Sequence, residues 1–378
     1  MTPAGPVRIA FVAGGLGQGG AEKQLVYMAR AVRDAGADVR VYCLTRGEHY
    51  EQTLIDAGLT PIWMGRRGAT MLRVLTLAAE LRRFRPHIAQ SAHFFMNLYV
   101  RFAAPLTGAL DVGAARSDIV YEVEHNGRWG PWLVRAPSAL IVNSYAAQRN
   151  TKAYGVPAER VHVLPNVIDL EAFDAASRFA MRGDSTDIVV VGIGSLIRAK
   201  RFDRFLRGLA AVRASGARVR GLLVGEGPER TALETLAREL GLLPNGVEFA
   251  GRRDDIPAQL RAADVLMLTS DHEGFPNVVL EAMAASLPVI STAAGDAGAV
   301  IQNGVTGCVA PVDDEDALIE HLGALVRSRE TRDKMGTAGR ARVESHYSLG
   351  GLGARLLHLH RAIAAGAGHR AALAALGN

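Results

Sequence analysis

Two carboxylates stand eight positions apart in the stretch DHEGFPNVVLEAMAASLPVI, residues 271–290. Glu273 lies in a segment broken by Gly274 and Pro276, whereas Glu281 lies within an apolar run of helical character. Glycine and proline at these places fit a tight turn that leads into a helix. Backbone N–H groups at a helix start attract a phosphate, and a carboxylate one turn further can accept hydrogen bonds from sugar hydroxyls. The alternative is a capping carboxylate and a surface glutamate.

A second candidate lies near the N-terminus, where Gly15, Gly17 and Gly20 match G-x-G-x-x-G after a strand-like run. This pattern is typical of dinucleotide-binding folds, in which an acidic residue at the end of the second strand holds the ribose. The second expected strand runs into VYCLTRG without a carboxylate, so we do not expect a nicotinamide cofactor. The turn with Gly17, Gly19 and Gly20 still presents backbone N–H groups that suit an acceptor sugar or a phosphate.

Short apolar runs that alternate with longer helical patterns must position these motifs. In the first half, strand-like runs lie at 7–14, 38–44, 87–94, 139–144 and 161–166, with helical patterns at 19–36 and 71–85. The pattern then restarts, with strand-like runs at 187–196, 219–224, 247–251, 265–270, 288–295 and 307–311, and helical patterns at 202–215 and 229–241. This α/β alternation predicts two doubly wound, Rossmann-like parallel sheets, each opening on a strand that runs into glycines.

The length of 378 residues favours two domains. We expect one over residues 1–170 and another over 171–350, because the segment 167–186 has weak periodicity and more polar residues. A helix over 351–378 is expected to pack back on the N-terminal domain. Ligands of open α/β sheets bind at the carboxyl ends of strands, so two such domains facing each other would form a cleft.

Positive charge is concentrated in the first half of the chain. Residues 1–185 carry 21 Lys+Arg and 16 Asp+Glu, or 21 − 16 = +5, and residues 186–378 carry 22 of each. A nucleic acid, an anionic membrane or a phosphorylated acceptor would fit this excess, and ordinary surface arginine is the alternative. Cys43 and Cys308 show no metal-type spacing, and no apolar run is long enough for a signal peptide or a spanning helix. We therefore expect a cytoplasmic protein.

The second half resembles a known family. EGFPNVVLEAMA resembles the E-x7-E signature of retaining glycosyltransferases of family 4, which have the two-domain GT-B fold. Around it, VGIGSLIRAKRFD, LLVGEGPER, VEFAGRRDDIPAQLRAADVLMLTSDHEGFP and NGVTGCVAPVDDEDAL are similar to family segments in the same order. In the first half, GQGGAEKQL and LPNVIDLEAF are similar to the family's GGAE loop and interdomain join. The resemblance covers about residues 7–350.

The resemblance implies a nucleotide-sugar donor, UDP- or GDP-sugar, in the second domain and a sugar, lipid-linked or small-molecule acceptor in the first. Lys200 would neutralise the diphosphate, Glu281 would hold the ribose and Glu273 would contact the donor sugar. Arg252 and Arg253 would edge the base pocket, mainly through their backbone. The other expected donor contacts are Gly274, Phe275, Pro276, Asn277, Val278, Ser195, Arg198 and Gly225.

The chain departs from the family pattern at some of these places. Ser195 stands where the family often has an arginine, and Arg198 and Arg201 are the neighbouring candidates to replace its charge. Ala299 stands where many members have a glutamate. These departures keep open a non-catalytic sugar-nucleotide- or lipid-binding module, while a nucleotide-sugar epimerase or a sugar phosphorylase is the enzymatic alternative within the fold.

In the first domain His93 falls at a strand end and is a catalytic candidate that would contact donor sugar or acceptor, although a lone histidine is often structural. The stretch RSDIVYEVEHNGRWG (116–130) is expected to be a loop-like acceptor wall, with charged residues Arg116, Asp118, Glu122, Glu124 and His125. The resemblance implies retention through front-face attack. No metal is expected, because the chain has no D-x-D motif at a strand end. No cofactor and no nucleic-acid partner are expected either.

An arginine-flanked helix is the last feature. The apolar pattern MLRVLTLAAELRRFR is accompanied by Arg66, Arg67, Arg73, Arg82, Arg83 and Arg85. Such a helix could hold the protein peripherally on an anionic membrane at its inner face. The alternative is an ordinary surface helix packed on the sheet.

Overall fold

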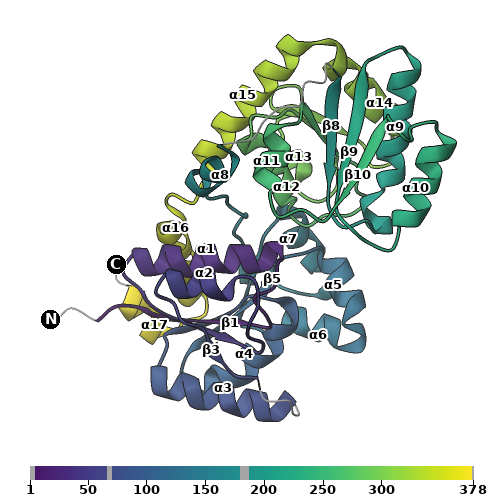
Figure 1. Cartoon of the computed structure of the whole chain (residues 1–378). Coiled ribbons are helices and arrows are strands. Elements are labelled where there is room, and N and C mark those ends of the chain that lie inside the picture. The colour runs from purple at the N-terminus through teal and green to yellow at the C-terminus, as the bar shows by residue number, and fades with distance from the viewer. Residues whose placement is uncertain (1–4, 66–69, 179–186, 377–378) are drawn as a thin grey trace. The chain divides into compact units, whose positions relative to one another are not determined.

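The structure is a computed structural model that describes residues 5–65, 70–178 and 187–376. The chain forms two compact units (Figure 1). Unit 1 comprises Met1–Val167 together with Leu349–Asn378, and unit 2 comprises Ile168–Ser348. The chain thus leaves unit 1 once and returns to it. Part of the expected domain boundary, residues 179–186, lies outside the described residues.

Unit 1 is built on a seven-stranded sheet in the order β3-β2-β1-β4-β5-β6-β7, and every neighbouring pair is parallel. The strands are β1 Arg8–Ala13, β2 Asp38–Cys43, β3 Ile62–Trp63, β4 Ile88–Ser91, β5 Leu110–Ala115, β6 Ala139–Val142 and β7 Val161–Val163. The order reverses between β1 and β4, which is where doubly wound sheets bind ligands.

Helices cover both faces of this sheet (Figure 1). They are α1 Gly20–Asp34, α2 Glu51–Asp56, α3 Thr70–Phe84, α4 Asn97–Ala103, α5 Ile119–His125, α6 Gly130–Arg135, α7 Tyr145–Thr151, α16 Leu352–Gly366 and α17 Arg370–Leu376. Successive residues of a strand point to opposite faces. Ile9 and Phe11 accordingly pack with α1 and α16, whereas Ala10 and Val12 pack with α3 and α4.

The C-terminal segment completes the core of unit 1. Leu352, Leu356 and Ile363 of α16 are buried in the same cluster as Leu25 and Met28 of α1. The segment after residue 350 forms two helices, α16 and α17, which pack against each other, where the sequence pattern predicts one. The turn at Gly368, with φ +63, separates them.

Unit 2 repeats the architecture with a six-stranded sheet in the order β10-β9-β8-β11-β12-β13, again parallel throughout. Its strands are β8 Ile188–Ile193, β9 Val219–Val224, β10 Val247–Gly251, β11 Val265–Leu268, β12 Val289–Thr292 and β13 Gly307–Ala310. The order reverses between β8 and β11. The prediction of two Rossmann-like, doubly wound parallel sheets is therefore confirmed.

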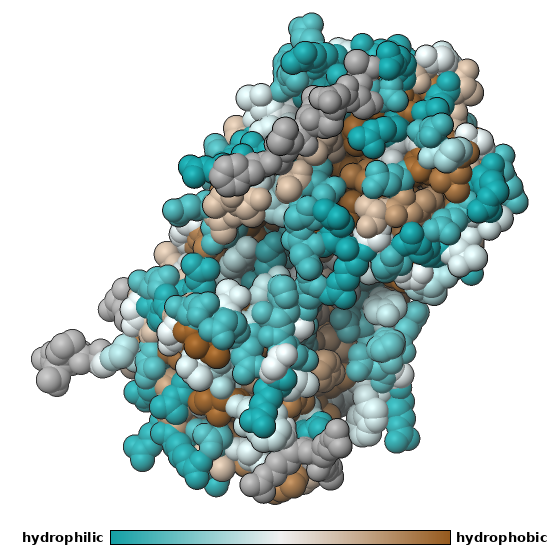
Figure 2. Space-filling model, viewed as in Figure 1, coloured by the Kyte–Doolittle hydropathy of each residue, from teal (hydrophilic) through white to brown (hydrophobic). Residues whose placement is uncertain are grey.

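The helices of unit 2 are α8 Leu170–Ser177, α9 Phe202–Ala214, α10 Arg230–Glu239, α11 Ile256–Arg261, α12 Asn277–Ala284, α13 Ala297–Val300, α14 Glu315–Arg327 and α15 Arg329–His346. Val189 and Val191 of β8 pack with α12, and Val190 between them packs with α9 and α14. Hydrophilic side chains cover most of the visible face of the molecule, and hydrophobic residues reach it in patches on both units (Figure 2).

Candidate active site

The loops after β8 and β11 meet at the point where the strand order of unit 2 reverses. The first loop contains a short 3-10 helix, Arg198–Lys200, and the second carries Glu273. Lys200 Nζ donates to Glu273 Oε1 at 2.6 Å, and the two side chains are 22% and 11% exposed. Ser270 Oγ donates to the same Glu273 oxygen at 2.7 Å. The structure thus brings together two of the predicted residues, which are 73 positions apart.

Hydroxyl groups fix the backbone beneath this pair. Thr269 Oγ1 donates to the carbonyl oxygens of Lys200, at 3.0 Å, and Arg201, at 2.9 Å. The Asp271 N–H donates to Ala199 O at 2.9 Å, so the two loops are joined in both directions. These contacts hold the 3-10 helix against the end of β11, so Lys200 and Glu273 lie on a supported frame.

An arginine–aspartate network extends this frame. Arg204 is 6% exposed and donates to Asp271 Oδ1 at 2.6 Å and to Thr269 O at 3.2 Å. Arg201 donates to Asp203 at 2.9 Å and to Asp271 at 3.3 Å. Arg201 also has φ +49, a left-handed conformation that costs a residue with a side chain about 1–2 kcal/mol. The two carboxylates that bind its guanidinium help to hold it there.

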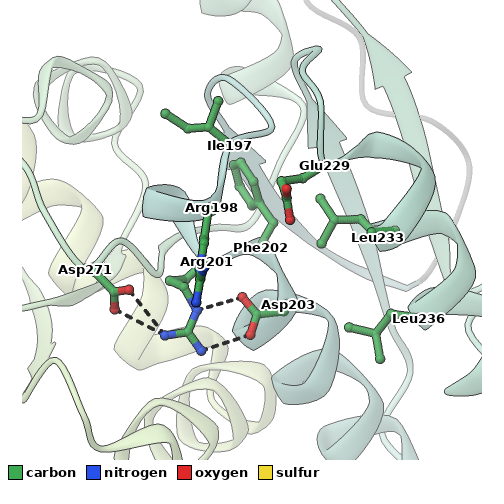
Figure 3. A pocket seen from close by; sticks show the side chains of 10 residues that line it. Ile197, Arg198, Arg201, Phe202, Asp203, Glu229, Leu233, Leu236 and Asp271 are labelled. Atoms are coloured by element: carbon green, nitrogen blue, oxygen red, sulfur yellow. Dashed lines mark hydrogen bonds and ion pairs between the residues drawn. The ribbon is translucent and has the colours of Figure 1, made fainter. Parts of the chain in front are cut away.

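Asp203 Oδ2 also accepts a hydrogen bond from Arg207 Nη2 at 2.7 Å. Burial would raise the pKa of Asp203, but the hydrogen bonds and charges of Arg201 and Arg207 outweigh it and lower that pKa to about 2. Figure 3 shows Arg201 between Asp203 and Asp271 on the wall of a pocket of about 560 Å³. The pocket has an apolar side formed by Ile197, Phe202, Ala232, Leu233 and Leu236.

Ser195 stands where the family often has an arginine, and the two candidates to replace its charge, Arg198 and Arg201, differ in what they contact. The guanidinium of Arg201 is bound to Asp203 and Asp271, so it is already neutralised. Arg198 is exposed at the mouth of the pocket, and within the described residues its side chain makes no hydrogen bond or ion pair. Arg198 is therefore the arginine available for an incoming anion.

Close backbone approaches explain two glycines around the frame. A Cβ on Gly225, where φ is +147, would lie 1.9 Å from Gly194 O. A Cβ on Gly295, where φ is +58, would lie 2.3 Å from Glu273 O and 2.5 Å from Gly274 O. Both positions accept only glycine without displacing the loops that carry Lys200 and Glu273.

The segment after Glu273 enters α12 as the sequence predicts. Pro276 is the N-cap residue and Glu281 lies one turn into the helix, half-buried. The side chain of Phe275 is 7% exposed and packs against Tyr347, so only the backbone of this residue can face a ligand. Asn277 and Val278 are half-buried at the first turn.

Arg252 and Arg253 follow β10 and are exposed. Arg253 donates to both oxygens of Asp255 at 2.9 Å, and this hydrogen bond raises the pKa of the arginine. Both arginines lie on the β10 side of the sheet, and no described contact links Arg253 to Lys200 or Glu273.

In unit 1 the corresponding reversal point carries His93. The Gly14 N–H donates to His93 Nδ1 at 3.1 Å, and His93 Nε2 lies 3.1 Å from Glu22 Oε1. Because a backbone N–H can only donate, Nδ1 is the acceptor and the proton of the neutral ring is on Nε2, facing Glu22. Both ring nitrogens are thus used inside unit 1, and Glu22 and His93 together orient the glycine turn.

That turn is lined by carboxylates. Burial would raise the pKa of Glu22, but its hydrogen bonds, to His93 and to the backbone, hold it below the usual value. The Leu16 N–H donates to Glu48, and the Gly19 N–H donates to Gly17 O at 3.0 Å. Two carboxylates at this turn disfavour a phosphate and favour the hydroxyl groups of a sugar.

The expectation of a loop over 116–130 is wrong, because most of this stretch is helical. Asp118 caps α5 by accepting from the N–H groups of Val120, at 2.7 Å, and Tyr121, at 3.1 Å. Ile119 and Val123, four positions apart, bury one side of the helix. Glu122 lies on α5 near His93, and burial together with the charge of Asp118 raises its pKa despite the nearby histidines.

Several residues of this site are absent from the sequence-based prediction. Thr269 and Ser270 end the strand-like run 265–270, and Asp271 follows it two residues before Glu273; this position at a strand end is the signal that could have found them. Exposed aromatic side chains also follow three neighbouring strands: Phe95 after β4, Tyr121 after β5 and Tyr145 after β6. Exposed aromatic rings therefore lie along the carboxyl edge of the sheet in unit 1.

The arginine-flanked helix is α3. It buries Val74, Leu77 and Leu81, while Met71, Leu72 and Leu75 are among its exposed side chains. Arg82, Arg83 and Arg85 are exposed beyond them, and Arg66 and Arg67 lie outside the described residues.

The described helices contain none that is long and apolar enough to cross a membrane. Within the same residues, no group of three or more metal-ligating side chains occurs.

Comparison with known proteins identifies the family. Residues 18–172 match the profile of Glycosyltransferase Family 4, and residues 187–328 match that of Glycosyl transferases group 1. The chain belongs to glycosyltransferase family 4.

Two curated members illustrate the range of this glycosyltransferase family. The chain is 31% identical over 237 residues to the GDP-mannose-dependent alpha-(1-6)-phosphatidylinositol monomannoside mannosyltransferase of Mycolicibacterium smegmatis, covering 59% of this chain and 62% of the relative. It is 26% identical over 242 residues to the N-acetyl-alpha-D-glucosaminyl L-malate synthase of Bacillus anthracis, covering 64% and 59%. The matched region spans about three fifths of the length of these relatives.

Solved structures of the family share the fold. Anabaena Alr3699/HepE, in complex with UDP and glucose, superposes with a TM-score of 0.81 at 21% identity, over 93% of this chain and 99% of that one. WaaG, a glycosyltransferase involved in lipopolysaccharide biosynthesis, superposes with a TM-score of 0.68 at 20% identity, over 92% and 98%. The prediction of a GT-B fold for this glycosyltransferase family 4 chain is confirmed.

Proposed function

We propose that the protein is a retaining glycosyltransferase that moves a sugar from a nucleotide-sugar donor to a hydroxyl group of a sugar or lipid acceptor. The observation that carries the proposal is the Lys200–Glu273 pair at the reversal point of unit 2, followed by Glu281 one turn into α12. Glu273 and Glu281, proposed to contact the donor sugar and the ribose, lie along one loop and helix, and the neighbouring loop after β8 supplies the cation Lys200. This arrangement suits a nucleoside diphosphate with a sugar attached.

Lys200 and the backbone N–H groups at the start of α12 stabilise the departing diphosphate. The bond between the anomeric carbon and the phosphate oxygen breaks while the acceptor oxygen bonds to the same face of that carbon. The acceptor proton passes to the departing phosphate oxygen, so no protein nucleophile is needed. Fixed donors that face the developing negative charge supply the rate enhancement. With Lys200 in this role, we propose that the reaction needs no metal and no cofactor.

Unit 1 binds the acceptor in this proposal. The carboxylates Glu22 and Glu48 at the glycine turn accept hydrogen bonds from hydroxyl groups, and His93 holds the turn in place. Such a site favours a hydroxyl-rich acceptor. The mannosyltransferase of Mycolicibacterium smegmatis is named for a phosphatidylinositol monomannoside, which contains a sugar.

We further propose peripheral contact with the inner face of an anionic membrane. The exposed apolar side chains Met71, Leu72 and Leu75 can enter the lipid interface, while Arg82 and Arg83 lie near acidic headgroups. Sedimentation with anionic and neutral vesicles at low and moderate salt tests this contact. Failure to bind anionic vesicles at either salt concentration would contradict it.

A donor screen tests the reaction. The protein is mixed with UDP-, GDP- and ADP-sugars in the presence of a chelator, and thermal stability and nucleotide release are measured. Stabilisation by one donor, with release that increases when an acceptor is added, is the expected result. Stabilisation without transfer to any acceptor would favour a non-catalytic sugar-nucleotide-binding module, a possibility that the serine at position 195 supports.

A further inference from the structure

A second pocket, of about 570 Å³, lies in unit 1 at the end of the sheet where β6 and β7 begin. Ala139 is the first residue of β6, Arg160 immediately precedes β7, and His162 lies within β7. In a parallel sheet this is the end opposite to the glycine turn and His93. The volume falls within the range of pockets that bind small molecules, about 300–1,000 Å³. The pocket is therefore separate from the acceptor site proposed above.

The side chains around the pocket are predominantly basic. Arg101, Arg135 and Arg160 line it, against one carboxylate, Glu159. Burial lowers the pKa of His162, so this histidine is neutral at neutral pH and can serve as a hydrogen-bonding group. Three positive charges against one negative charge leave an excess of two on the pocket lining, and Asp111, which pairs with Arg101, reduces the local excess to one.

Arg160 is held in place without being neutralised. Its Nε donates to Ser138 O at 3.0 Å, and its Nη2 donates to Arg135 O at 3.0 Å and to Pro137 O. All of these acceptors are backbone carbonyls, which fix the guanidinium but carry no full charge. A guanidinium positioned in this way is preorganised for an anion.

The other two arginines differ in their pairing: Arg101 forms an ion pair with the buried Asp111, whereas Arg135 makes no ion pair within the described chain. Arg101 Nη1 lies 3.6 Å from Asp111 Oδ2, and that carboxylate already accepts from Ser138 N at 2.9 Å and from Ser138 Oγ at 2.5 Å. Arg135 Nε donates to Pro131 O at 3.1 Å. The charge of Arg135 is therefore uncompensated, and Arg101, which is paired with Asp111 at more than hydrogen-bonding distance, still has N–H donors to spare.

The end of α16 also borders the pocket through Ile363, Gly366 and Ala367. A helix C-terminus could neutralise arginine with its free carbonyl groups. Here those carbonyls are occupied, because Ile363 O, Ala364 O and Ala365 O accept from Ala367 N, His369 N and Gly368 N. The helix end thus leaves most of the positive charge available.

We propose that this pocket binds a phosphate group, carried by a soluble phosphate ester or by a phospholipid headgroup. Planar guanidinium groups pair with phosphate oxygens in a two-pronged arrangement, and three of them surround one cavity here. The site is independent of the proposed transfer reaction, because it lies at the opposite end of the sheet from the residues assigned to that reaction. Phosphate binding here would also account for part of the excess positive charge in the first half of the chain.

Calorimetric titration with inorganic phosphate and glycerol 3-phosphate tests the proposal. The titrations use a Lys200→Ala background, which removes the competing phosphate contact in unit 2. Arg101→Gln combined with Arg135→Gln should weaken phosphate binding about tenfold or more, because two charge-assisted contacts are lost. Arg128→Gln is the matched control, since Arg128 is an exposed arginine of unit 1 that stacks on Trp129 away from the pocket.

Arg160 is left unchanged because its loss would also release three backbone carbonyls. If the double variant does not fold, Arg135→Gln alone replaces it, since this side chain is exposed. Equal phosphate affinity in the pocket variant and its background would overturn the proposal, as would an equal loss in Arg128→Gln. Vesicle sedimentation separates the sources: loss of phosphate binding alone supports a soluble ester, and loss of anionic-vesicle binding as well supports a lipid headgroup.

Discussion

Lys200 and Glu273 form an ion pair at 2.6 Å from two loops that follow β8 and β11, the strands between which the sheet order reverses. Ser270 donates to the same carboxylate, and Thr269 holds the backbone of Lys200. The ammonium is therefore positioned before any ligand arrives. A donor diphosphate must compete with Glu273 for it, and this competition leads to the first prediction.

We expect Lys200→Ala to lower turnover by about 10²-fold or more, because a fixed donor to the leaving group is lost. Glu273→Gln should act differently, since it frees Lys200: the free nucleoside diphosphate should bind several-fold more tightly while turnover falls. Steady-state kinetics and nucleotide titration measure the two effects. A fully active Lys200→Ala variant would refute the phosphate assignment.

Glu281→Ala should raise the donor KM by about tenfold, the cost of hydrogen bonds to a charged group. The rise in KM should depend on the 2′-hydroxyl of the donor ribose. A donor that lacks the 2′-hydroxyl should already bind more weakly to the unmodified protein, and the substitution should then weaken it little further. An equal additional loss with both donors would mean that Glu281 acts elsewhere.

Arg204→Met should destabilise unit 2 by about 3 kcal/mol, because it leaves the buried side of Asp271 without its closest partner. Urea unfolding measures the change. Arg253→Met is the matched control, since its ion pair with Asp255 is exposed and screened by solvent, so its loss should destabilise the unit much less. Equal losses in the two variants would contradict a supporting role for Arg204.

The lowered pKa of Asp203 predicts that the free energy of unfolding falls at acidic pH. Its pKa is lowered from 3.8 to about 2 in the folded protein, so the stabilisation is complete above pH 4 and is lost as the pH falls through 2. The contribution is at most about 2 kcal/mol, by linkage between protonation and folding. Asp203→Asn should lack this part of the acid sensitivity, whereas Asp313→Asn, an exposed control, should retain it. Unfolding free energies at pH 5 and pH 2.5 provide the comparison.

The sequence pattern predicted the frame of the site because strand ends and helix starts are local signals. Glu273, Pro276 and Glu281 lie on the loop and helix that the glycine and proline positions indicated. Lys200 meets Glu273 because parallel strands bring their carboxyl ends to one edge. These placements need only the alternation of apolar runs and a few turn residues.

Other features depend on partners that local patterns do not reveal. The left-handed backbone of Arg201 accompanies its bonds to Asp203 and Asp271, the latter 70 positions away. The run of polar residues over 116–130 concealed a helix, because Asp118 supplies the cap and only Ile119 and Val123 supply the buried face. Such outcomes follow from tertiary contacts that override composition.

The return of the chain to unit 1 at Leu349 has a consequence for synthesis on the ribosome. Residues 168–348 form one continuous unit, which can fold as soon as it has emerged. Unit 1 emerges first but lacks Leu352, Leu356 and Ile363, so the apolar side of α1 that α16 covers stays open until α16 has been synthesised. The core of unit 1 is thus completed only after the whole of unit 2 has been made, and during that interval the side of α1 that packs with α16 is an exposed apolar surface.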